Sequence, residues 1–392
     1  MTPVRVLFTT IPGWGHVHPM VPLAKAMAER GDDVAWATAA EFVAPLEREG
    51  FEVMKAGRNN SENMGELDRR FPEWKALAGP DLPPFMFPRF FGAVIAPVML
   101  ADLMPLARAW QPTLMVREAA EFAGPIVAAA LAVPIVTHAL GTLRPPAFVA
   151  AASEFVTPLW EAQGLAPRPF GGSYDHLYLD IYPKSLRTLD YSEVGDVQML
   201  RPVAFAAAGD DAELPDLVND DSALPLVYVT FGTVFNKDAA VISTVVQGVA
   251  ELGVRVVVTV GPAGDPASLG PQPDNVVVAP YIPQTELLSR CAAVVSHSGS
   301  GTFLAALSLG LPHLCIPQAA DQFENAAAAA RSGAGVVLAP GSVTVQSVRE
   351  GLRQVLDDPS YRAAAQRLSA EIDAMPAPTE VAGVLADRFG AS

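Results

Sequence analysis

Cysteine is nearly absent from this sequence, which has only Cys291 and Cys315 among its 392 residues. Two cysteines cannot form a framework of disulfides, and this usage is typical of a chain in a reducing compartment. We expect both to be small buried apolar side chains. Because the sequence also lacks a DxD carboxylate pair beside a small-residue loop and a His/Cys cluster at ligand spacing, no metal site is expected.

Charged residues are scarce as well, at 17% of the chain, and they are unbalanced. With 26 Lys and Arg against 42 Asp and Glu, the formal net charge is −16. Such a chain repels nucleic acids and anionic lipid surfaces, so neither is expected as a partner. An anionic ligand would have to be held by local backbone dipoles rather than by a general basic field.

Targeting segments are the third absence. The segment MTPVRVLFTTIPGWGH carries one early Arg and an apolar run too short for a signal peptide, and no apolar span of about 18 residues is expected further along. We therefore expect a soluble, cytoplasmic protein without a membrane span. Hydrophobic residues nevertheless make up 51% of the chain, enough for two globular domains.

Strand and helix patterns alternate in both halves of the chain, which predicts two doubly wound α/β domains in tandem, with a crevice where the carboxyl ends of the strands meet. Two aromatic segments interrupt this alternation. Segment 57–100 is expected to be a loop or short-helix excursion that forms a lid or pocket wall, and segment 142–187 is expected to be irregular and to cover the same side of the first sheet. An acidic segment between the halves predicts a linker. The predicted divisions are a first domain at 1–208, the linker at 209–222 and a second domain at 223–376.

The segment HSGSGT, residues 297–302, follows a predicted strand and enters a predicted helix. A glycine-rich turn at a helix N-terminus points unpaired N–H groups at one spot, which suits a diphosphate. His297 alone could be an ordinary buried histidine, but its Gly, Ser and Thr neighbours favour a phosphate contact. The TFGT segment at 230–233 is either an ordinary loop or the opposite wall of that site.

The segment GWGH, which ends at His16, follows the first predicted strand and resembles part of a GxGxxG dinucleotide motif. The third Gly is replaced by His18 and no acidic residue is placed for a ribose, so NAD binding is disfavoured. Histidine at a strand end suits a general base, and a carboxylate can orient its ring. Glu118 is the preferred partner over Glu121, although both could be solvated acids at a helix start.

Together, GHVHP, HSGSGT and DQFENA resemble the GT-B glycosyltransferases of family GT1, most closely the actinobacterial enzymes that decorate polyketide and other natural-product aglycones. The likeness runs over essentially the whole chain. It implies two Rossmann-like domains facing a central crevice, with a last helix at about 377–392 that packs back on the first domain. It also implies inverting, metal-independent transfer of a sugar from a nucleotide diphosphate to an acceptor hydroxyl, and is compatible with a homodimer.

The resemblance assigns His16 as the base and places its acidic partner at or near Glu118, with Ser298 in place of a usual Gly in the phosphate loop. The implied donor-binding residues contact the nucleobase, the diphosphate and the sugar hydroxyls; they are Gly232, Thr233, Tyr281, Ile282, His297, Gly299, Ser300, Gly301, Thr302, Asp321 and Gln322. Expected acceptor-binding residues, for which core packing is the alternative, are Phe85, Phe87, Phe91, Glu121 and Tyr174.

Ala305 stands where plant members that use UDP-sugars carry a ribose-binding Glu. Without that hydrogen-bond acceptor, the 2′-hydroxyl of a UDP-sugar contributes less to binding. This predicts a dTDP-linked deoxysugar as the donor. Three alternatives remain open at this point: a non-catalytic auxiliary homologue, a GT-B sugar-nucleotide epimerase with a second set of carboxylates, and an NAD-dependent dehydrogenase.

Overall fold

The computed structural model describes residues 3–77, 79–205, 213–219, 222–232, 239–261 and 264–390. The chain forms two compact α/β units, which confirms the expected fold class. The exact boundaries expected at 208 and 222 stay predictions, because 206–212 and 220–221 lie outside the described residues. Unit 1 comprises Met1–Tyr182, Leu189–Arg201 and Met375–Ser392, and unit 2 comprises Pro183–Thr188 and Pro202–Ala374.

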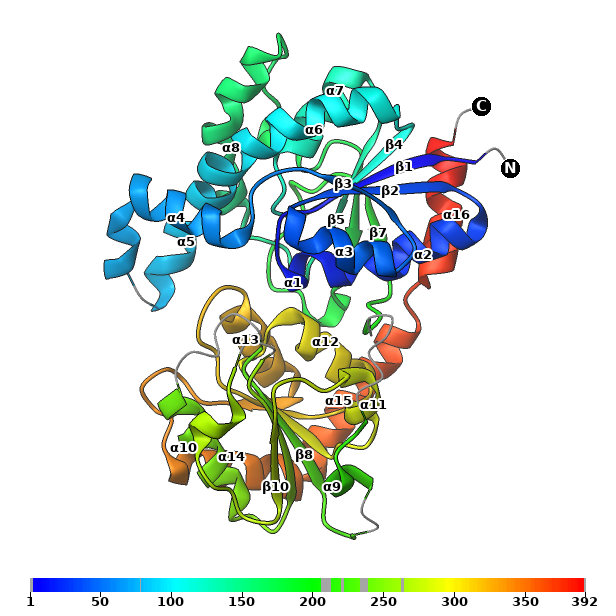
Figure 1. Ribbon diagram of the computed structural model, residues 1–392. Coiled ribbons are helices and arrows are strands. Elements are labelled where there is room, and N and C mark those ends of the chain that lie inside the picture. Colours follow the sequence, from blue (N-terminus) through cyan, green and yellow to red (C-terminus); the bar gives the residue numbers. More distant parts are fainter. Residues whose placement is uncertain are drawn as a thin grey trace. The chain divides into compact units, whose positions relative to one another are not determined.

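The sheet of unit 1 is parallel and has the order β3-β2-β1-β4-β5-β6-β7 (Figure 1). Strand order reverses between β1 and β4, so the chain segments that leave their carboxyl ends diverge there and leave room for a ligand. The strands are β1 (Arg5–Thr9), β2 (Asp33–Thr38), β3 (Glu52–Lys55), β4 (Leu114–Glu118), β5 (Ile135–His138), β6 (Leu177–Asp180) and β7 (Val197–Met199).

Helices connect these parallel strands, because a parallel crossover needs a long connection. The last helix, α16, packs against α2, so the C-terminus returns to unit 1 (Figure 1). The helices of unit 1 are α1 (Trp14–Val17), η1 (His18–Met20), α2 (Val21–Arg30), α3 (Ala40–Arg48), α4 (Asn60–Arg70), η2 (Pro72–Ala76), η3 (Gly79–Asp81), α5 (Leu82–Phe87), η4 (Pro88–Ile95), α6 (Ala96–Trp110), α7 (Ala123–Leu131), α8 (Pro146–Ala162), η5 (Pro169–Gly172) and α16 (Pro378–Phe389).

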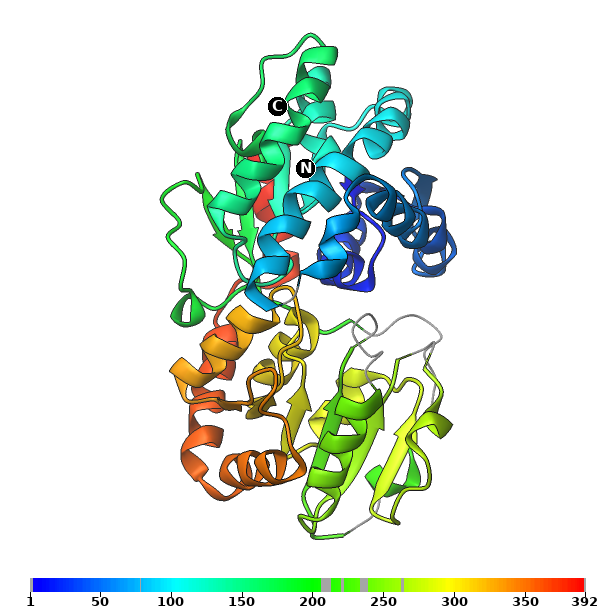
Figure 2. The same ribbon diagram turned by 90° about the vertical axis from the view of Figure 1, so that its left-hand side faces the viewer.

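The Pro- and Phe-rich segment is one continuous helical run, Leu82–Trp110, in which η4 is a π-helix between α5 and α6. Its most apolar 18-residue stretch has a mean hydropathy of 1.9, so the expectation that no such span occurs is wrong by length and composition. In that stretch 56% is buried inside the protein, and Leu100 and Leu103 belong to the core of unit 1. Helix α8 packs on η4 (Figure 2). The run therefore serves as a core element.

The expectation of irregular structure at 142–187 is also wrong, because this segment contains helix α8 and strand β6. Helix α8 begins at Pro146 and holds Pro158 in its interior. Proline removes a backbone donor and is typical of breaks, so its presence hides the helix pattern in the sequence.

The sheet of unit 2 is also parallel, with the order β10-β9-β8-β11-β12-β13, and its core is rich in valine. Its strands are β8 (Leu226–Thr230), β9 (Arg255–Thr259), β10 (Val276–Ala279), β11 (Ala293–Ser296), β12 (His313–Cys315) and β13 (Gly335–Val337). Its helices are η6 (Lys184–Leu186), α9 (Asp216–Asn219), α10 (Ala239–Ala250), η7 (Pro266–Leu269), α11 (Gln284–Ser289), α12 (Ser300–Ser308), α13 (Gln322–Ser332), α14 (Val345–Asp357) and α15 (Pro359–Asp373).

Candidate functional site

His16 and Glu118 lie together at the carboxyl edge of the unit 1 sheet. His16 is in α1, directly after β1, and Glu118 is the last residue of β4, the strand that pairs with β1. His16 Nδ1 lies 3.2 Å from Glu118 Oε1, although the two groups lack the alignment of a full hydrogen bond. The Glu118 side chain is fully buried, whereas that of His16 is 23% exposed. A buried carboxylate thus faces one nitrogen of a partly accessible imidazole.

The ring of His16 is packed from two sides. A Cβ on Gly13 would lie 2.8 Å from His16 Cδ2, so only glycine allows the ring its observed place. On another side the Phe91 ring, which comes from the π-helical segment η4, has its centroid 5.9 Å from the imidazole. Phe87 in turn packs at 5.0 Å on Phe91. Gly13 was not among the predicted site residues, although its place in the GWGH turn was a signal for it.

Two other predicted aromatic residues, Phe85 and Tyr174, pack against residues other than His16. Phe85 packs against the guanidinium of Arg89, 3.9 Å from the ring centroid. Tyr174 packs at 5.3 Å on Phe170, and burial raises the pKa of its hydroxyl to about 12. The acceptor-binding roles of Phe85 and Tyr174 stay predictions.

Glu121 differs from Glu118 in its surroundings. Its side chain is buried, and its carboxylate accepts hydrogen bonds from the Thr9 hydroxyl at 2.8 Å and from the N–H groups of Ala123 at 2.5 Å and Gly124 at 2.9 Å. Burial raises the pKa of Glu121, and the nearby Arg117 opposes that rise. The carboxylate points into the protein, so a direct acceptor contact, which stays a prediction, would have to replace these bonds.

In unit 2 the HSGSGT loop links β11 to α12 as the sequence pattern predicts. Gly299 is the N-cap of α12 and provides no side-chain cap to the first-turn N–H groups, which belong to Ser300, Gly301 and Thr302. These N–H groups and the positive end of the helix dipole point in the same direction. The arrangement can bind an anionic oxygen through the backbone alone.

His297 is enclosed by two glycines. A Cβ would lie 2.8 Å from His297 Nε2 at Gly232 and 2.5 Å from it at Gly299. Burial lowers the pKa of His297 to about 4, so the imidazole is neutral near pH 7 and has one N–H to donate. Gly232 has a φ of +72°, which favours glycine on a second ground. Thr233, the next predicted residue, lies outside the described residues.

Side chains at the start of helix α13 form hydrogen bonds with the HSGSGT loop. The Ser300 hydroxyl donates to Asp321 Oδ2 at 2.6 Å. Asn325, which is fully buried, donates from Nδ2 to the Ser298 carbonyl at 2.9 Å and to the Ser300 hydroxyl at 3.0 Å. The sequence prediction did not include Asn325. Its spacing, four residues after Asp321 and so on the same helix face, was an available signal.

The side chain of Gln322 has different hydrogen-bond partners from that of Asp321. Its Oε1 accepts the N–H groups of Gln318 at 2.7 Å and Ala319 at 2.9 Å, and the residue is 2% exposed. The side-chain oxygen is thus used to hold the loop before α13, which leaves the amide N–H groups as the part of Gln322 that could meet a ligand.

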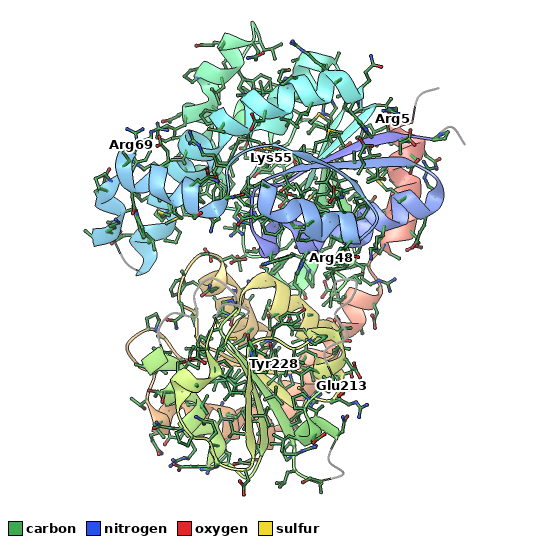
Figure 3. All side chains as sticks on the ribbon, in the orientation of Figure 1. Arg5, Arg48, Lys55, Arg69, Glu213 and Tyr228 are labelled. Atoms are coloured by element: carbon green, nitrogen blue, oxygen red, sulfur yellow. The ribbon has the colours of Figure 1, made fainter. Side chains whose placement is uncertain are left out.

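The predicted nucleobase segment is tied to the HSGSGT loop. Tyr281 is 39% exposed, whereas Ile282 is packed in the core. The side chain of Gln284 donates to Thr302 Oγ1 and to the Tyr228 hydroxyl, both at 3.2 Å. Tyr228 comes from β8, inside unit 2 (Figure 3). Gln284 thus connects strand β8 to the HSGSGT loop, although the two are far apart in the sequence. Neither Gln284 nor Tyr228 was predicted to contribute to the site.

Ser298 occupies a backbone conformation that favours glycine, with a φ of +64°. A non-glycine residue there costs about 1–2 kcal/mol, partly offset because glycine is more flexible in the unfolded chain. We expect Ser298→Gly to stabilise the protein by about 0.5–1 kcal/mol, a rise in Tm of roughly 1–4 °C. Calorimetry of the two proteins measures this, and a lower Tm in the variant would contradict it.

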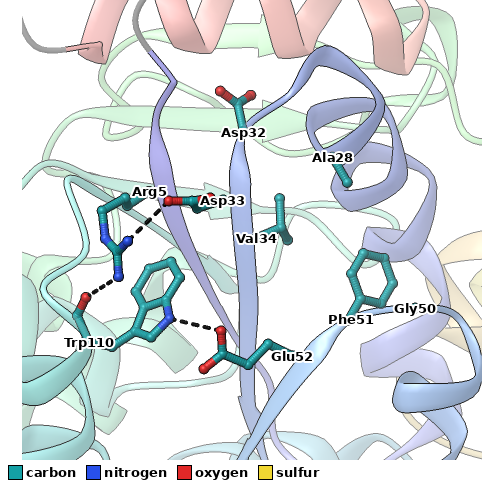
Figure 4. Close-up of a pocket in the computed structure, with 9 residues that line it drawn as sticks. All are labelled: Arg5, Ala28, Asp32, Asp33, Val34, Gly50, Phe51, Glu52 and Trp110. Carbon is teal, nitrogen blue, oxygen red and sulfur yellow. Dashed lines mark hydrogen bonds and ion pairs between the residues drawn. The ribbon is translucent and has the colours of Figure 1, made fainter.

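A cavity of about 320 Å³ lies at the opposite, amino edge of the unit 1 sheet (Figure 4). Its polar groups satisfy one another: Arg5 pairs with Asp33 at 3.0 Å and donates to the Trp110 carbonyl, and Trp110 Nε1 donates to Glu52 at 3.2 Å. It contains no predicted site residue. Among the described residues no group of three or more His, Cys, Asp or Glu could hold a metal ion.

Comparison with known proteins gives consistent matches over the whole chain. The family described as erythromycin biosynthesis protein CIII-like matches residues 30–160 through its N-terminal domain and residues 243–387 through its C-terminal domain. An L-demethylnoviosyl transferase of Streptomyces niveus is 31% identical over 390 residues, covering 98% of each chain. The elloramycin glycosyltransferase ElmGT of Streptomyces olivaceus is 30% identical and covers 99% of this chain and 98% of its own.

Solved structures of glycosyltransferases are also similar to this chain over its whole length. The glycosyltransferase VinC, in complex with dTDP, has a TM-score of 0.81 at 28% identity and covers 98% of each chain. SnogD from Streptomyces nogalater, also a glycosyltransferase, has a TM-score of 0.77 at 28% identity and covers 99% of this chain and 100% of its own. The chain therefore belongs to the erythromycin biosynthesis protein CIII-like family, and it is a GT-B glycosyltransferase of the natural-product type in family GT1.

Proposed function

We propose that this enzyme moves a deoxysugar from dTDP to a hydroxyl group of a hydrophobic natural-product aglycone with inversion at the anomeric carbon, and that His16 is the general base. The observation that carries the proposal is the 3.2 Å approach of Glu118 Oε1 to His16 Nδ1. That contact leaves Nε2 as the nitrogen to accept a proton. The carboxylate stabilises the imidazolium that forms.

In the proposed reaction, Nε2 of His16 takes the proton of the acceptor hydroxyl while its oxygen attacks the anomeric carbon. The bond between that carbon and the β-phosphate oxygen breaks, and its electron pair leaves with dTDP. One carbon–oxygen bond forms as another breaks, and the proton stays on His16 until solvent removes it. Base catalysis of this kind contributes about 10²–10⁴-fold to the rate.

The leaving diphosphate is stabilised in unit 2. The open N-terminus of α12 and the N–H of a neutral His297 supply donors without a net positive charge. Groups fixed in advance at the place where charge develops stabilise it without reorganisation. This supports the sequence argument that a chain of net charge −16 holds an anion through local dipoles.

The acceptor class is inferred from relatives and from the aromatic wall beside His16. The relatives are named for natural products or their sugars, as with ElmGT, and Phe91 and Phe87 give the base an apolar neighbour. Apolar rings favour an apolar aglycone. A cytoplasmic location and a homodimer remain proposals from the sequence.

We expect the protein to bind dTDP about 3–10-fold more tightly than UDP, because the 2′-hydroxyl of UDP gives up a hydrogen bond to water and gains none from the protein, a loss of about 0.5–1.5 kcal/mol. Ala305, which the resemblance places at the ribose-binding position, is buried in α12, and its side chain has no hydrogen-bond acceptor. Isothermal titration with dTDP, UDP and NADH measures this preference. Equal or tighter UDP binding would refute the dTDP assignment, and binding of NADH alone would refute the donor class.

Transfer should continue at an unchanged rate in excess EDTA, because the proposed stabilisation of the leaving group uses N–H groups of this chain. The measurement compares initial rates with EDTA and with added Mg²⁺. Complete loss of activity in EDTA, restored by Mg²⁺, would show that the proposed N–H groups are insufficient.

The sequence left open an auxiliary homologue without catalysis, a GT-B epimerase and an NAD-dependent dehydrogenase, and membership in a family of glycosyltransferases argues against all three. An epimerase would need a second set of carboxylates around the sugar. In the described part of the chain, the Asp321 carboxylate at the start of α13 lies against the HSGSGT loop, where it accepts a hydrogen bond from the Ser300 hydroxyl at 2.6 Å. Detection of a glycosylated product separates all three readings, since an auxiliary protein forms no product and an epimerase changes only the sugar nucleotide.

A further inference from the structure

Arg117 is buried in unit 1, one residue before Glu118, and the guanidinium has three protein acceptors. Nε donates to the Thr137 hydroxyl at 3.0 Å, and the two terminal nitrogens donate to the carbonyls of Ala119, at 3.2 Å, and Glu121. Both carbonyls belong to the turn that follows Glu118. An arginine fork that holds two carbonyls of one turn restricts the backbone of that turn.

The carboxylate of Glu121 holds the same turn from the other side. Its oxygens accept the N–H groups of Ala123 at 2.5 Å and Gly124 at 2.9 Å, at the start of α7. It also accepts the Thr9 hydroxyl at 2.8 Å, and Thr9 is the last residue of β1, the strand that leads to His16. Glu121 therefore links the end of β1 to the turn after β4.

A buried arginine and a buried glutamate are poorly explained by stability alone. Removing two such groups from water costs several kcal/mol per ion, and apolar replacements of similar volume are often as stable or more so. The direct hydrogen bonds of Arg117 and Glu121 go mostly to backbone groups of the 119–124 turn. The Glu118 carboxylate is held by the same turn, since its Oε2 accepts the Ala120 N–H at 2.6 Å.

We propose that Arg117 and Glu121 form a buried clamp that positions the Glu118 carboxylate against Nδ1 of His16. The clamp is defined as these two side chains together with the 119–124 turn that they hold. Both are positioning residues, because they act on the reaction through Glu118. The inference rests on the proposed function, in which His16 is the base, and it replaces the expected acceptor contact of Glu121 with a role inside the protein.

Gly124→Ala tests the clamp without deleting a charge. A Cβ at Gly124 would lie 2.6 Å from Glu121 Oε2 and 3.2 Å from the Thr9 hydroxyl, so the added methyl displaces the carboxylate. We expect kcat to fall at least tenfold with the KM for the dTDP-sugar unchanged, because the donor site lies in unit 2. Gly383→Ala is the matched control, since a Cβ there meets nothing within 4 Å, and it should keep the kcat of the parent. A kcat within threefold of the parent for Gly124→Ala would overturn the proposal.

Two further variants keep the proposal testable if Gly124→Ala does not fold. Glu121→Gln retains an acceptor oxygen for the two N–H groups and should keep kcat within about threefold, whereas Glu121→Ala should lose at least tenfold. The pair Arg117→Met with Glu121→Leu removes both charges and is expected to fold. If this folded double variant keeps the parent's kcat, the clamp is only structural and the proposal is wrong; a tenfold lower kcat supports it.

A double-mutant cycle with Glu118→Gln separates this proposal from the proposed function. If the clamp acts through Glu118, adding Gly124→Ala to Glu118→Gln lowers kcat by less than a further threefold. A full additional tenfold loss would overturn the clamp while leaving the base assignment intact. Parent-like activity of His16→Ala would instead refute the base assignment, whatever the clamp variants do.

Discussion

Replacing His16 with alanine should lower kcat/KM for glycosyl transfer by about 10²–10⁴-fold, the usual contribution of a general base. The affinity for dTDP should be unchanged, because the residues assigned to dTDP are in unit 2. The loss should be carried by kcat, since the proton is removed in the transition state. Product formation by chromatography and dTDP titration of the same protein samples measure the two quantities.

His176→Asn is the matched control for this prediction. His176 is a half-buried histidine of unit 1 whose Nδ1 accepts the Ile135 N–H at 3.4 Å, and it has no role in the proposed reaction. We expect its kcat/KM to stay within a few-fold of the parent. If His16→Ala transfers sugar at the parental rate, the base must be another group, or the physiological role is that of an auxiliary protein that does not depend on His16.

Gly299→Ala should weaken dTDP binding by roughly tenfold or more, since overpacking of this kind costs about 1–3 kcal/mol. The backbone of Gly299 has a φ of −62° and a ψ of 141°, which alanine adopts without strain. The effect is therefore steric: the new Cβ would lie 2.5 Å from His297 Nε2 and would move the imidazole ring away from the N-terminus of α12. Isothermal titration with dTDP measures the change in Kd.

The double variant His297→Ala with Gly299→Ala checks that the effect passes through the ring. Without the imidazole the methyl group has space, so the double variant should bind dTDP no more weakly than His297→Ala alone. An additional tenfold loss in the double variant would mean that Gly299 matters for another reason, such as close approach of the phosphate to its backbone. Parental affinity in Gly299→Ala would show that the ring can shift without cost.

The sequence by itself determined which segments carry the chemistry. Alternating strand and helix patterns predicted two doubly wound units, and the HSGSGT and GWGH motifs identified two strand ends, because glycine and small hydroxyl residues at a strand-to-helix turn serve few purposes other than close approach to a ligand. The same reasoning failed at 82–110 and 146–162, where proline within helices masked their pattern.

Only the tertiary structure decided what each polar side chain touches. Glu118 and Glu121 are three residues apart and look alike in sequence, yet one faces His16 and the other faces Thr9 and the start of α7. Asn325 and Gln284 contact the HSGSGT loop from other segments of the chain, and Arg117 in β4 contacts Thr137 in the neighbouring strand β5. Sequence patterns report local backbone preference and burial, whereas these contacts depend on strand register and side-chain direction, which are set only when the sheet and its helices pack.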